Sequence, residues 1–174
     1  GGVATVLSSI SRFVPFTWIA SALSDGDRLA ARMSDVTMIQ TDLGNHDLSL
    51  RYVLTSKEVY EKYYNVFSNP FLWFLQHYMW NLPYTPNVDQ LIYDAWEKGY
   101  IPVNLAFADS IVEEAGGPST TPIILLHDYH LYLVGGEIRK RIPGSIIQHF
   151  IHIPWPSPRY WTMMPAHMRT EILQ

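Results

Sequence analysis

Cysteine is absent from the 174 residues, which excludes disulfide bonds and thiolate-ligated metal centres. Positive charge is also scarce, because 12 Lys and Arg residues stand against 16 Asp and Glu, a formal net charge of −4. A protein that binds the phosphate backbone of nucleic acids normally carries a basic stripe, so we expect no nucleic-acid partner. No apolar run reaches the roughly 18–20 residues that a membrane-spanning helix needs, so we expect no membrane partner either.

The signatures of several common catalytic sites are missing as well. There is no Walker A phosphate loop, and the seven histidines show no compact metal-ligand spacing. We therefore predict neither a metal nor a bound cofactor. The chain does not open with the basic and apolar segments typical of a signal peptide. Together with the lack of cysteine, this favours a cytoplasmic protein.

Apolar residues, in contrast, are plentiful at 48%, and the length is that of about one domain. The runs Ile123–Leu126 and Ile146–Ile151 are typical of buried strands, and the segment 131–141 between them has helical character. Strand, helix and strand in this order predict a βαβ unit with a parallel sheet. We expect Ile123–Leu126 to be covered on both faces, as in α/β proteins with helices on both sides of the sheet.

Capping patterns mark two helices upstream of this unit. Ser24 with Asp27, and Thr55 with Glu58, have the spacing of a capping box, in which the side chain of each residue accepts a hydrogen bond from the other's backbone. The remaining pattern before residue 56 predicts a helix over Val3–Phe13, a strand over Phe16–Ser21, and short strands between Val36 and Tyr52.

Two prolines divide the helical region that follows. Pro70 is expected to interrupt the first helix, since proline lacks a backbone donor and clashes with the preceding turn. Asn87 is predicted to cap a longer helix whose apolar stripe runs from Val88 to Ile111. Pro102 lies inside this helix and should kink or split it.

Polar side chains follow both predicted strands of the βαβ unit. Asp128 and His152 each stand just past a strand end, where α/β sheets bind their ligands. Asp128 caps the following helix or accepts hydrogen bonds from a ligand. His152 lies between a strand and two prolines, and is either a structural hydrogen-bonding residue or a catalytic one.

Aromatic residues and glycines supply further candidates for binding. Tyr64 and Trp73 either fill the core or form the wall of a sugar-binding site, where a phenol can donate to a phosphate. Gly1 and Gly2 precede a predicted helix and would let its N-terminal amides approach a phosphate, although two glycines alone are a weak signal.

An ordered set of motifs across nearly the whole chain resembles the trehalose-6-phosphate synthase family, glycosyltransferase family 20. Besides the leading Gly1-Gly2, the Thr17-Trp18 strand and Val103-Asn104-x-x-Phe-Ala, the set comprises Tyr63-Tyr-Asn-x-Phe-Ser-Asn, Leu72-Trp-x-x-x-His-Tyr, His127-Asp-Tyr-His-Leu and His152-Ile-Pro-Trp-Pro. Each motif by itself is modest, but their order and spacing make the set specific.

This resemblance implies a retaining GT-B glycosyltransferase, built from two Rossmann-like domains that face each other across a cleft. Residues 1–174 would be an incomplete N-terminal, acceptor-side Rossmann-like domain, and the C-terminal nucleotide-sugar domain would be absent. The reaction would transfer glucose from a nucleotide-glucose, with UDP-glucose expected, to glucose-6-phosphate. The partners would be this donor and this sugar-phosphate acceptor, and self-association into a homo-oligomer stays open.

The resemblance also implies roles for particular residues. Tyr64 and Trp73 would contact the acceptor sugar phosphate, with Trp18 at the border of the same pocket. Asp128 would hold acceptor hydroxyls, and His152 would lie beside the reacting centre. Gly1 and Gly2 would approach a phosphate through their amides, and no metal or covalent enzyme nucleophile would take part.

Departures from the family pattern leave alternatives open. The family's first strand with its arginine, and the basic residues that hold donor phosphates, are missing, so we expect the chain alone to be inactive. The segment Ile19-Ala-Ser-Ala after Trp18 differs from the usual form and is similar to relatives that join cyclitols. The alternatives are therefore a relative with another acceptor, such as a glucosylglycerol-phosphate synthase or a cyclitol-joining pseudo-glycosyltransferase, and a catalytically silent binding paralogue.

Overall fold

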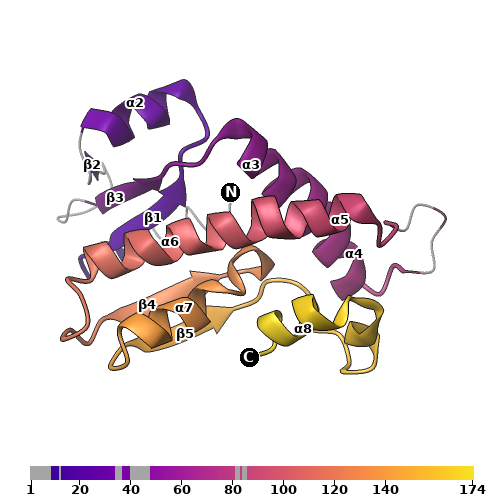
Figure 1. The fold of residues 1–174 in the computed structure, drawn as a ribbon. Helices are drawn as coiled ribbons and strands as arrows, with labels where there is room; N and C mark the ends of the chain where they lie inside the picture. Colours follow the sequence, from indigo (N-terminus) through magenta and orange to yellow (C-terminus); the bar gives the residue numbers. More distant parts are fainter. Residues whose placement is uncertain (1–8, 12, 34–36, 40–47, 81–82, 84–85) are drawn as a thin grey trace. The chain divides into compact units, whose positions relative to one another are not determined.

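The computed structural model describes residues 9–11, 13–33, 37–39, 48–80, 83 and 86–174. The chain forms two compact units, Gly1–Thr55 (unit 1) and Ser56–Gln174 (unit 2), whose elements are labelled in Figure 1. Gly1, Gly2 and most of the helix predicted over Val3–Phe13 lie outside the described residues, among which Ser9 and Ile10 are helical.

Unit 1 contains a three-stranded sheet in the order β1–β3–β2. β1 (Thr17–Ser21) pairs in parallel with β3 (Leu48–Val53), and β2 (Thr37–Ile39) pairs antiparallel with β3. The strand predicted over Phe16–Ser21 is thereby confirmed, as is the presence of short strands between Val36 and Tyr52.

The helix α2 (Asp25–Met33) of unit 1 begins with the predicted capping box. Ser24 Oγ accepts from the Asp27 N–H at 3.0 Å, and Asp27 Oδ2 accepts from the Ser24 N–H at 2.8 Å. The Ser24 backbone donor stabilises the carboxylate and lowers the pKa of Asp27 below its ordinary value. These bonds satisfy amides that the first turn of a helix leaves unpaired.

The second predicted capping box is wrong by one residue. Ser56, not Thr55, caps α3 (Lys57–Glu61), because Ser56 Oγ accepts from the Val59 N–H at 3.2 Å. The Thr55 carbonyl instead accepts from Arg28 Nη1 at 2.7 Å. Ser and Thr at adjacent positions are both good caps, so only the observed backbone decides between them.

The first long helix of unit 2 continues through Pro70, so the predicted interruption is wrong. From α3 it runs through η1 (Lys62–Leu72) into α4 (Trp73–Gln76). η1 is a π-helix, in which each N–H bonds five residues back, as Trp73 does to the Ser68 carbonyl. An α-helical proline clashes with the carbonyl four residues back, and the wider π turn relieves that clash.

The second long helix begins two residues later than predicted and also contains a π segment. Its elements are α5 (Gln90–Ala95), η2 (Trp96–Tyr100) and α6 (Ile101–Glu114). Asp89, not Asn87, is the N-cap, since its Oδ1 accepts from the Leu91 N–H at 3.0 Å. Pro102 lies in the first turn of α6, directly after η2, and the helix continues past it, so the predicted split is absent.

The predicted βαβ unit is present in unit 2. β4 (Ile123–His127) and β5 (Ile146–Phe150) pair in parallel, and α7 (Val134–Arg141) connects them, as Figure 1 shows. His127 stands opposite Phe150 in the register, so both strands end at the same edge. With parallel strand pairs and helices in both units, the predicted α/β class is confirmed.

The two faces of β4 differ in burial, contrary to the prediction that both are covered. Leu126 is buried and packs next to Gly135 of α7, whereas Ile123 and Leu125 are 72% and 55% exposed. An uninterrupted apolar run therefore does not distinguish a strand covered on both faces from one with an exposed apolar face.

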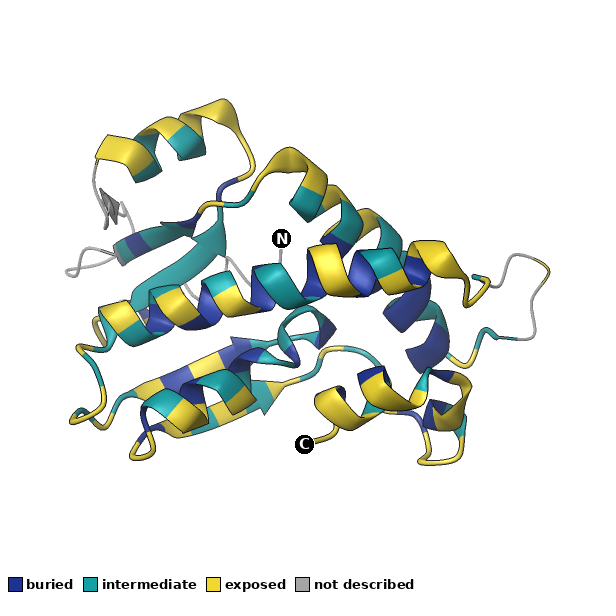
Figure 2. Cartoon of the chain, viewed as in Figure 1, coloured by how far each residue is buried: buried dark blue, intermediate teal, exposed yellow. Residues whose placement is uncertain are grey.

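The core of unit 2 is built from the two long helices. Figure 2 shows that buried residues recur along one side of α6, where Val103, Phe107 and Ile111 follow the predicted helical spacing. The largest fully buried side chains of these helices are Phe67, Phe71, Leu72, Leu75, Trp96 and Tyr100. The helices lie in close contact at Gly99, where a Cβ atom would lie 2.6 Å from the Tyr63 backbone nitrogen.

This approach gives a direct test of the packing. We expect Gly99→Ala to lower the free energy of unfolding by about 1–3 kcal/mol, because backbone atoms must move apart to admit the methyl group. Gly136→Ala is the matched control, since nothing lies within 4 Å of the position of its Cβ on α7. There the change should stabilise the helix by up to about 1 kcal/mol. Urea unfolding of both variants measures the difference, and equal stabilities would contradict the close approach.

Candidate functional site

Asp128 directly follows β4 and has backbone angles that are rare for any residue other than glycine. Its φ of 71° and ψ of 173° cost on the order of 1–3 kcal/mol and persist only where neighbouring contacts enforce them. Its N–H donates to the Phe150 carbonyl at 2.8 Å, its carbonyl accepts from His149 Nε2 at 2.8 Å, and its Oδ1 accepts from the Tyr129 N–H at 3.0 Å. The last bond confirms that Asp128 caps the next turn, while a contact with sugar hydroxyls stays a prediction.

Tyr100 of η2 holds the loop that follows Asp128, residues 129–133. Its buried hydroxyl donates to the Tyr129 carbonyl at 2.6 Å and accepts from the Tyr132 N–H at 3.3 Å. Burial raises the pKa of Tyr100 well above its ordinary value, so the phenol stays protonated. One hydroxyl thus fixes the backbone at two points of the loop.

Asn104 of α6 fixes the same loop one helical turn further on. Its fully buried amide donates through Nδ2 to the His130 carbonyl at 3.1 Å and to the Tyr100 carbonyl at 2.9 Å. Its Oδ1 accepts from the Leu133 N–H at 3.1 Å. A buried amide with donors and acceptor all engaged gives the loop a single position.

The His130 ring connects this loop to the first long helix. It stacks on Tyr64 with ring centroids 5.3 Å apart and an interplanar angle of 13°, and the Tyr129 ring lies 4.0 Å away on the loop itself. Asn69 Oδ1 accepts from His130 Nε2 at 3.3 Å and from the Tyr129 hydroxyl at 2.7 Å. Burial lowers the pKa of His130 to about 4, so this ring is neutral at physiological pH.

Tyr64 and Trp73 both lie outside the core, against the space-filling interpretation of these residues. Tyr64 is 36% exposed, whereas its neighbour Tyr63 is 4% exposed and fills the core. Trp73 is partly exposed and stacks on His77 with centroids 4.1 Å apart. Within the described residues Tyr64 is connected to the loop after Asp128 through His130, and no hydrogen bond or ring contact joins Trp73 to that loop.

His152 meets a second histidine at the strand ends. The distance between His127 Nδ1 and His152 Nε2 is 3.1 Å, and the ring centroids are 5.4 Å apart. Phe150 packs edge-on against His152 at 4.7 Å. Burial and the neighbouring His152 lower the pKa of His127, whereas Asp128 acts in the opposite direction. The predicted position of His152, at the strand end next to the Asp128 loop, is confirmed by this contact with His127, while its catalytic role stays a prediction.

The remaining predicted binding residues belong to unit 1 or lie outside the described residues. Trp18 is partly exposed in β1 of unit 1, opposite Leu50 of β3. Gly1 and Gly2 are outside the described residues, so their phosphate contact stays a prediction. Within the described ranges no group of three or more His, Asp and Glu side chains could hold a metal, and no helix is long and apolar enough to cross a bilayer.

The sequence interpretation missed the residues that hold the site together: Asn69, Tyr100, Asn104, His127 and His130. Asn69, Asn104, His127 and His130 stand inside motifs that were already singled out, but their roles were not predicted. Tyr100 stands outside these motifs, and its partner Tyr129 is 29 residues away.

Unit 2 therefore places a carboxylate and two imidazoles at the ends of adjacent parallel strands, with an exposed tyrosine stacked on the following loop. This defines an α/β protein with a candidate ligand site at the carboxyl edge of its sheet. The whole chain, residues 1–174, matches the model of glycosyltransferase family 20, and the chain belongs to this family.

Individual relatives agree with this assignment. Validamine 7-phosphate valienyltransferase of Streptomyces hygroscopicus subsp. jinggangensis is 28% identical over 99% of the chain. The UDP-forming alpha,alpha-trehalose-phosphate synthase A of Dictyostelium discoideum is 32% identical over 99% of it. A UDP-forming alpha,alpha-trehalose-phosphate synthase of Burkholderia xenovorans, solved in complex with glucose-6-phosphate, is 23% identical, covers 99% of the chain and has a TM-score of 0.68.

The chain spans only part of these relatives: 34% of the valienyltransferase, 21% of the Dictyostelium protein and 34% of the Burkholderia structure. The structural match confirms the predicted fold class, a Rossmann-like α/β part of a GT-B fold. These relatives are about three or more times as long as this chain.

The strain at Asp128 predicts an unusual order of stabilities. Asp128→Ala and Asp128→Gly both remove the bond to the Tyr129 N–H, but only glycine adopts the observed angles without strain. We expect Asp128→Gly to be more stable than Asp128→Ala by about 1–2 kcal/mol in urea unfolding. The reverse order would show that the backbone here relaxes freely.

The buried His130 predicts a loss of stability in mild acid. Its folded pKa of about 4 lies below the ordinary 6.5, so the unfolded chain binds a proton first as the pH falls. The free energy of unfolding therefore keeps its full value above about pH 6.5 and falls by up to about 3 kcal/mol between pH 6.5 and pH 4. His130→Phe keeps a ring beside Tyr64 and removes the titration. The difference in unfolding free energy between the two proteins should be constant above pH 7 and shrink below it, and a flat difference down to pH 4 would contradict a buried neutral imidazole.

Proposed function

We propose that this chain is the acceptor-side part of a trehalose-6-phosphate synthase-type glycosyltransferase. The complete enzyme transfers glucose from a nucleotide-glucose, UDP-glucose, to glucose-6-phosphate with retention of configuration. The observation that carries the proposal is the stack of exposed Tyr64 on His130, which places a phenol next to the loop that holds Asp128. The UDP-forming relative and the glucose-6-phosphate complex of the Burkholderia enzyme support the choice of substrates.

In this proposal each predicted residue keeps a defined task. The Tyr64 hydroxyl donates to the acceptor phosphate, and the Asp128 carboxylate accepts from sugar hydroxyls. His152 lies beside the glucose that is transferred. Trp73, Trp18 and the amides of Gly1 and Gly2 are further substrate-binding groups. The bond from glucose C1 to the donor phosphate breaks as the bond to the acceptor oxygen forms, and the leaving phosphate takes the acceptor proton, so catalysis consists of positioning and charge stabilisation.

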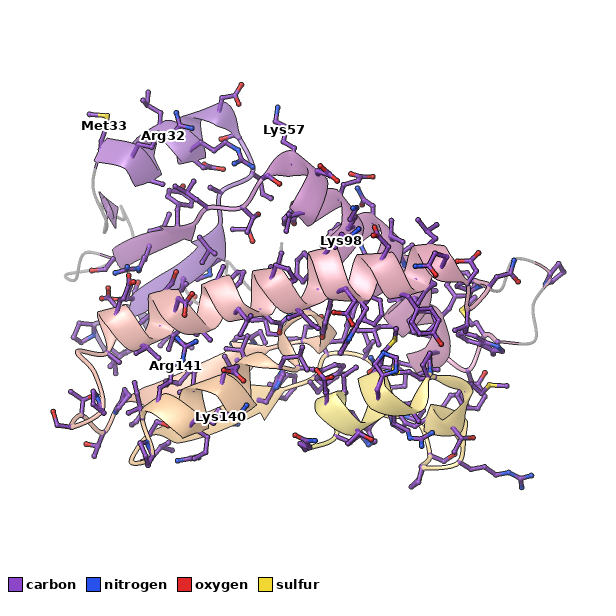
Figure 3. All side chains as sticks on the ribbon, in the orientation of Figure 1. Arg32, Met33, Lys57, Lys98, Lys140 and Arg141 are labelled. Atoms are coloured by element: carbon purple, nitrogen blue, oxygen red, sulfur yellow. The ribbon has the colours of Figure 1, made fainter. Side chains whose placement is uncertain are left out.

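Three cations of unit 2 are engaged in ion pairs with carboxylates. Figure 3 labels Lys98, Lys140 and Arg141, which pair with the carboxylates of Asp94, Glu137 and Asp109 respectively. Donor phosphates need a basic clamp of their own, which we assign to a second, nucleotide-sugar domain. The chain is then an incomplete N-terminal domain and is inactive alone. Cytoplasmic location and self-association stay predictions.

A cyclitol phosphate is the second candidate for the acceptor. The valienyltransferase relative, whose name specifies validamine 7-phosphate, matches 99% of the chain. Asp128 and Tyr64 suit either acceptor, because both ligands offer hydroxyls and a phosphate. A silent paralogue is disfavoured, since the strain at Asp128 would serve no ligand.

Removing the Tyr64 ring tests the acceptor site in the chain itself. We expect Tyr64→Ala to weaken glucose-6-phosphate binding about tenfold or more in calorimetric titrations, because a hydrogen bond to a charged phosphate is lost. Its melting temperature should change little, since the ring is partly exposed. Tyr93→Ala is the matched control, because Tyr93 is 38% exposed and stacks on His167 in the same manner.

The same titrations separate the candidates. Unchanged affinity in Tyr64→Ala, or an equal loss in Tyr93→Ala, would contradict the acceptor site. Tighter binding of validamine 7-phosphate than of glucose-6-phosphate would transfer the assignment to the second candidate.

A further inference from the structure

His127 has no task in the proposed function, yet it makes the one hydrogen bond that His152 has within the described part of the chain. Its Nδ1 lies 3.1 Å from His152 Nε2, which is within hydrogen-bonding distance for two ring nitrogens. The rings are nearly parallel, with an interplanar angle of 21°. One of the two nitrogens must carry the proton and the other must accept it, so the bond couples the tautomers of the two rings.

The pairing of β4 with β5 brings the two histidines together. His127 is the last residue of β4 and stands opposite Phe150 in the parallel register, two residues before His152. The Asp128 N–H continues the ladder to the Phe150 carbonyl at 2.8 Å. Pairing with β5 therefore holds His127 in place, whereas His152 is exposed on the loop after β5.

Phe150 completes the support of the His152 ring from the side. It packs edge-on against His152 at a centroid distance of 4.7 Å. With Nε2 bonded to His127 and one edge against Phe150, the remaining nitrogen, Nδ1, is the atom of His152 that is left for a ligand. Residues that orient a functional histidine through its second nitrogen in this way set its tautomer and ring plane.

We propose that His127 is the positioning residue of His152, fixing its ring plane and tautomer through the Nδ1–Nε2 hydrogen bond so that Nδ1 faces the bound sugar. The pairing of the rings stands on the structure alone, and the contact with sugar rests on the proposed function. His127 itself touches no substrate in this arrangement.

Nitrogen NMR of the 174-residue chain tests the pairing without any ligand. Two-bond proton–nitrogen spectra at pH 7.5, recorded with EDTA to exclude metal ions, should show His152 in a single tautomer. His127→Phe keeps an aromatic ring in the stack but removes the nitrogen, so the two ring nitrogens of His152 should then show averaged shifts. His127→Gln keeps a hydrogen-bonding partner for Nε2, so the His152 shifts should move back toward the wild-type values, and the control His167→Gln, whose ring stacks on Tyr93, should change nothing at His152. Identical His152 shifts in the wild type and in His127→Phe would overturn the proposal.

Transfer kinetics test the role of the pair in the longer enzyme that contains this chain. We expect His127→Phe to lower kcat about tenfold with little change in the KM for the acceptor, and His127→Gln to recover most of the loss. Wild-type turnover in His127→Phe would overturn the positioning role. A wild-type enzyme that transfers no sugar would contradict the proposed function instead, and the NMR comparison would then decide the pairing by itself.

Discussion

Two buried hydrogen-bonding side chains, Tyr100 and Asn104, fix the backbone of residues 129–133, and the arrangement of the candidate site depends on them. A strained conformation such as that of Asp128 persists only when neighbouring contacts over-determine it. The second long helix supplies these contacts through its buried side chains. Core packing therefore maintains the strained backbone of Asp128. The same bonds set the position of His130, and through its ring stack they set the exposed ring of Tyr64.

The electrostatic character of the site follows from this packing. Burial lowers the pKa of His130 to about 4 and also lowers the pKa of His127, so burial favours the uncharged form of both imidazoles near Asp128. Within the described residues no lysine or arginine contacts Asp128. A carboxylate that is not consumed by an ion pair retains acceptor capacity for hydroxyl groups, which suits a sugar better than an anion. In the proposed function the acceptor phosphate is bound at another point of the site, where Tyr64 offers a donor.

The helices show which structural features local sequence patterns predict and which depend on packing. Helix positions, the capping box at Ser24 and the βαβ unit follow from periodicity and capping chemistry, which act over a few residues. The effects of Pro70 and Pro102 were predicted less well, because their cost depends on whether the turn around them is α or π. Whether the turn is α or π depends on the packing of the two helices, whose backbones lie in close contact at Gly99.

The sequence by itself determined the α/β class, the family and the positions of Asp128 and His152 at strand ends, because strand order and the parallel rule place those ends at one edge. The composition of the sequence also excluded disulfide bonds, because the chain contains no cysteine. Only the tertiary structure decided that Tyr64 stacks on His130, that Asn69 and Asn104 hold the loop, and that His127 pairs with His152. These contacts join residues 25 to 66 positions apart, and no local pattern encodes a partner at such a distance, since it is the folding of intervening helices and strands that brings the two together.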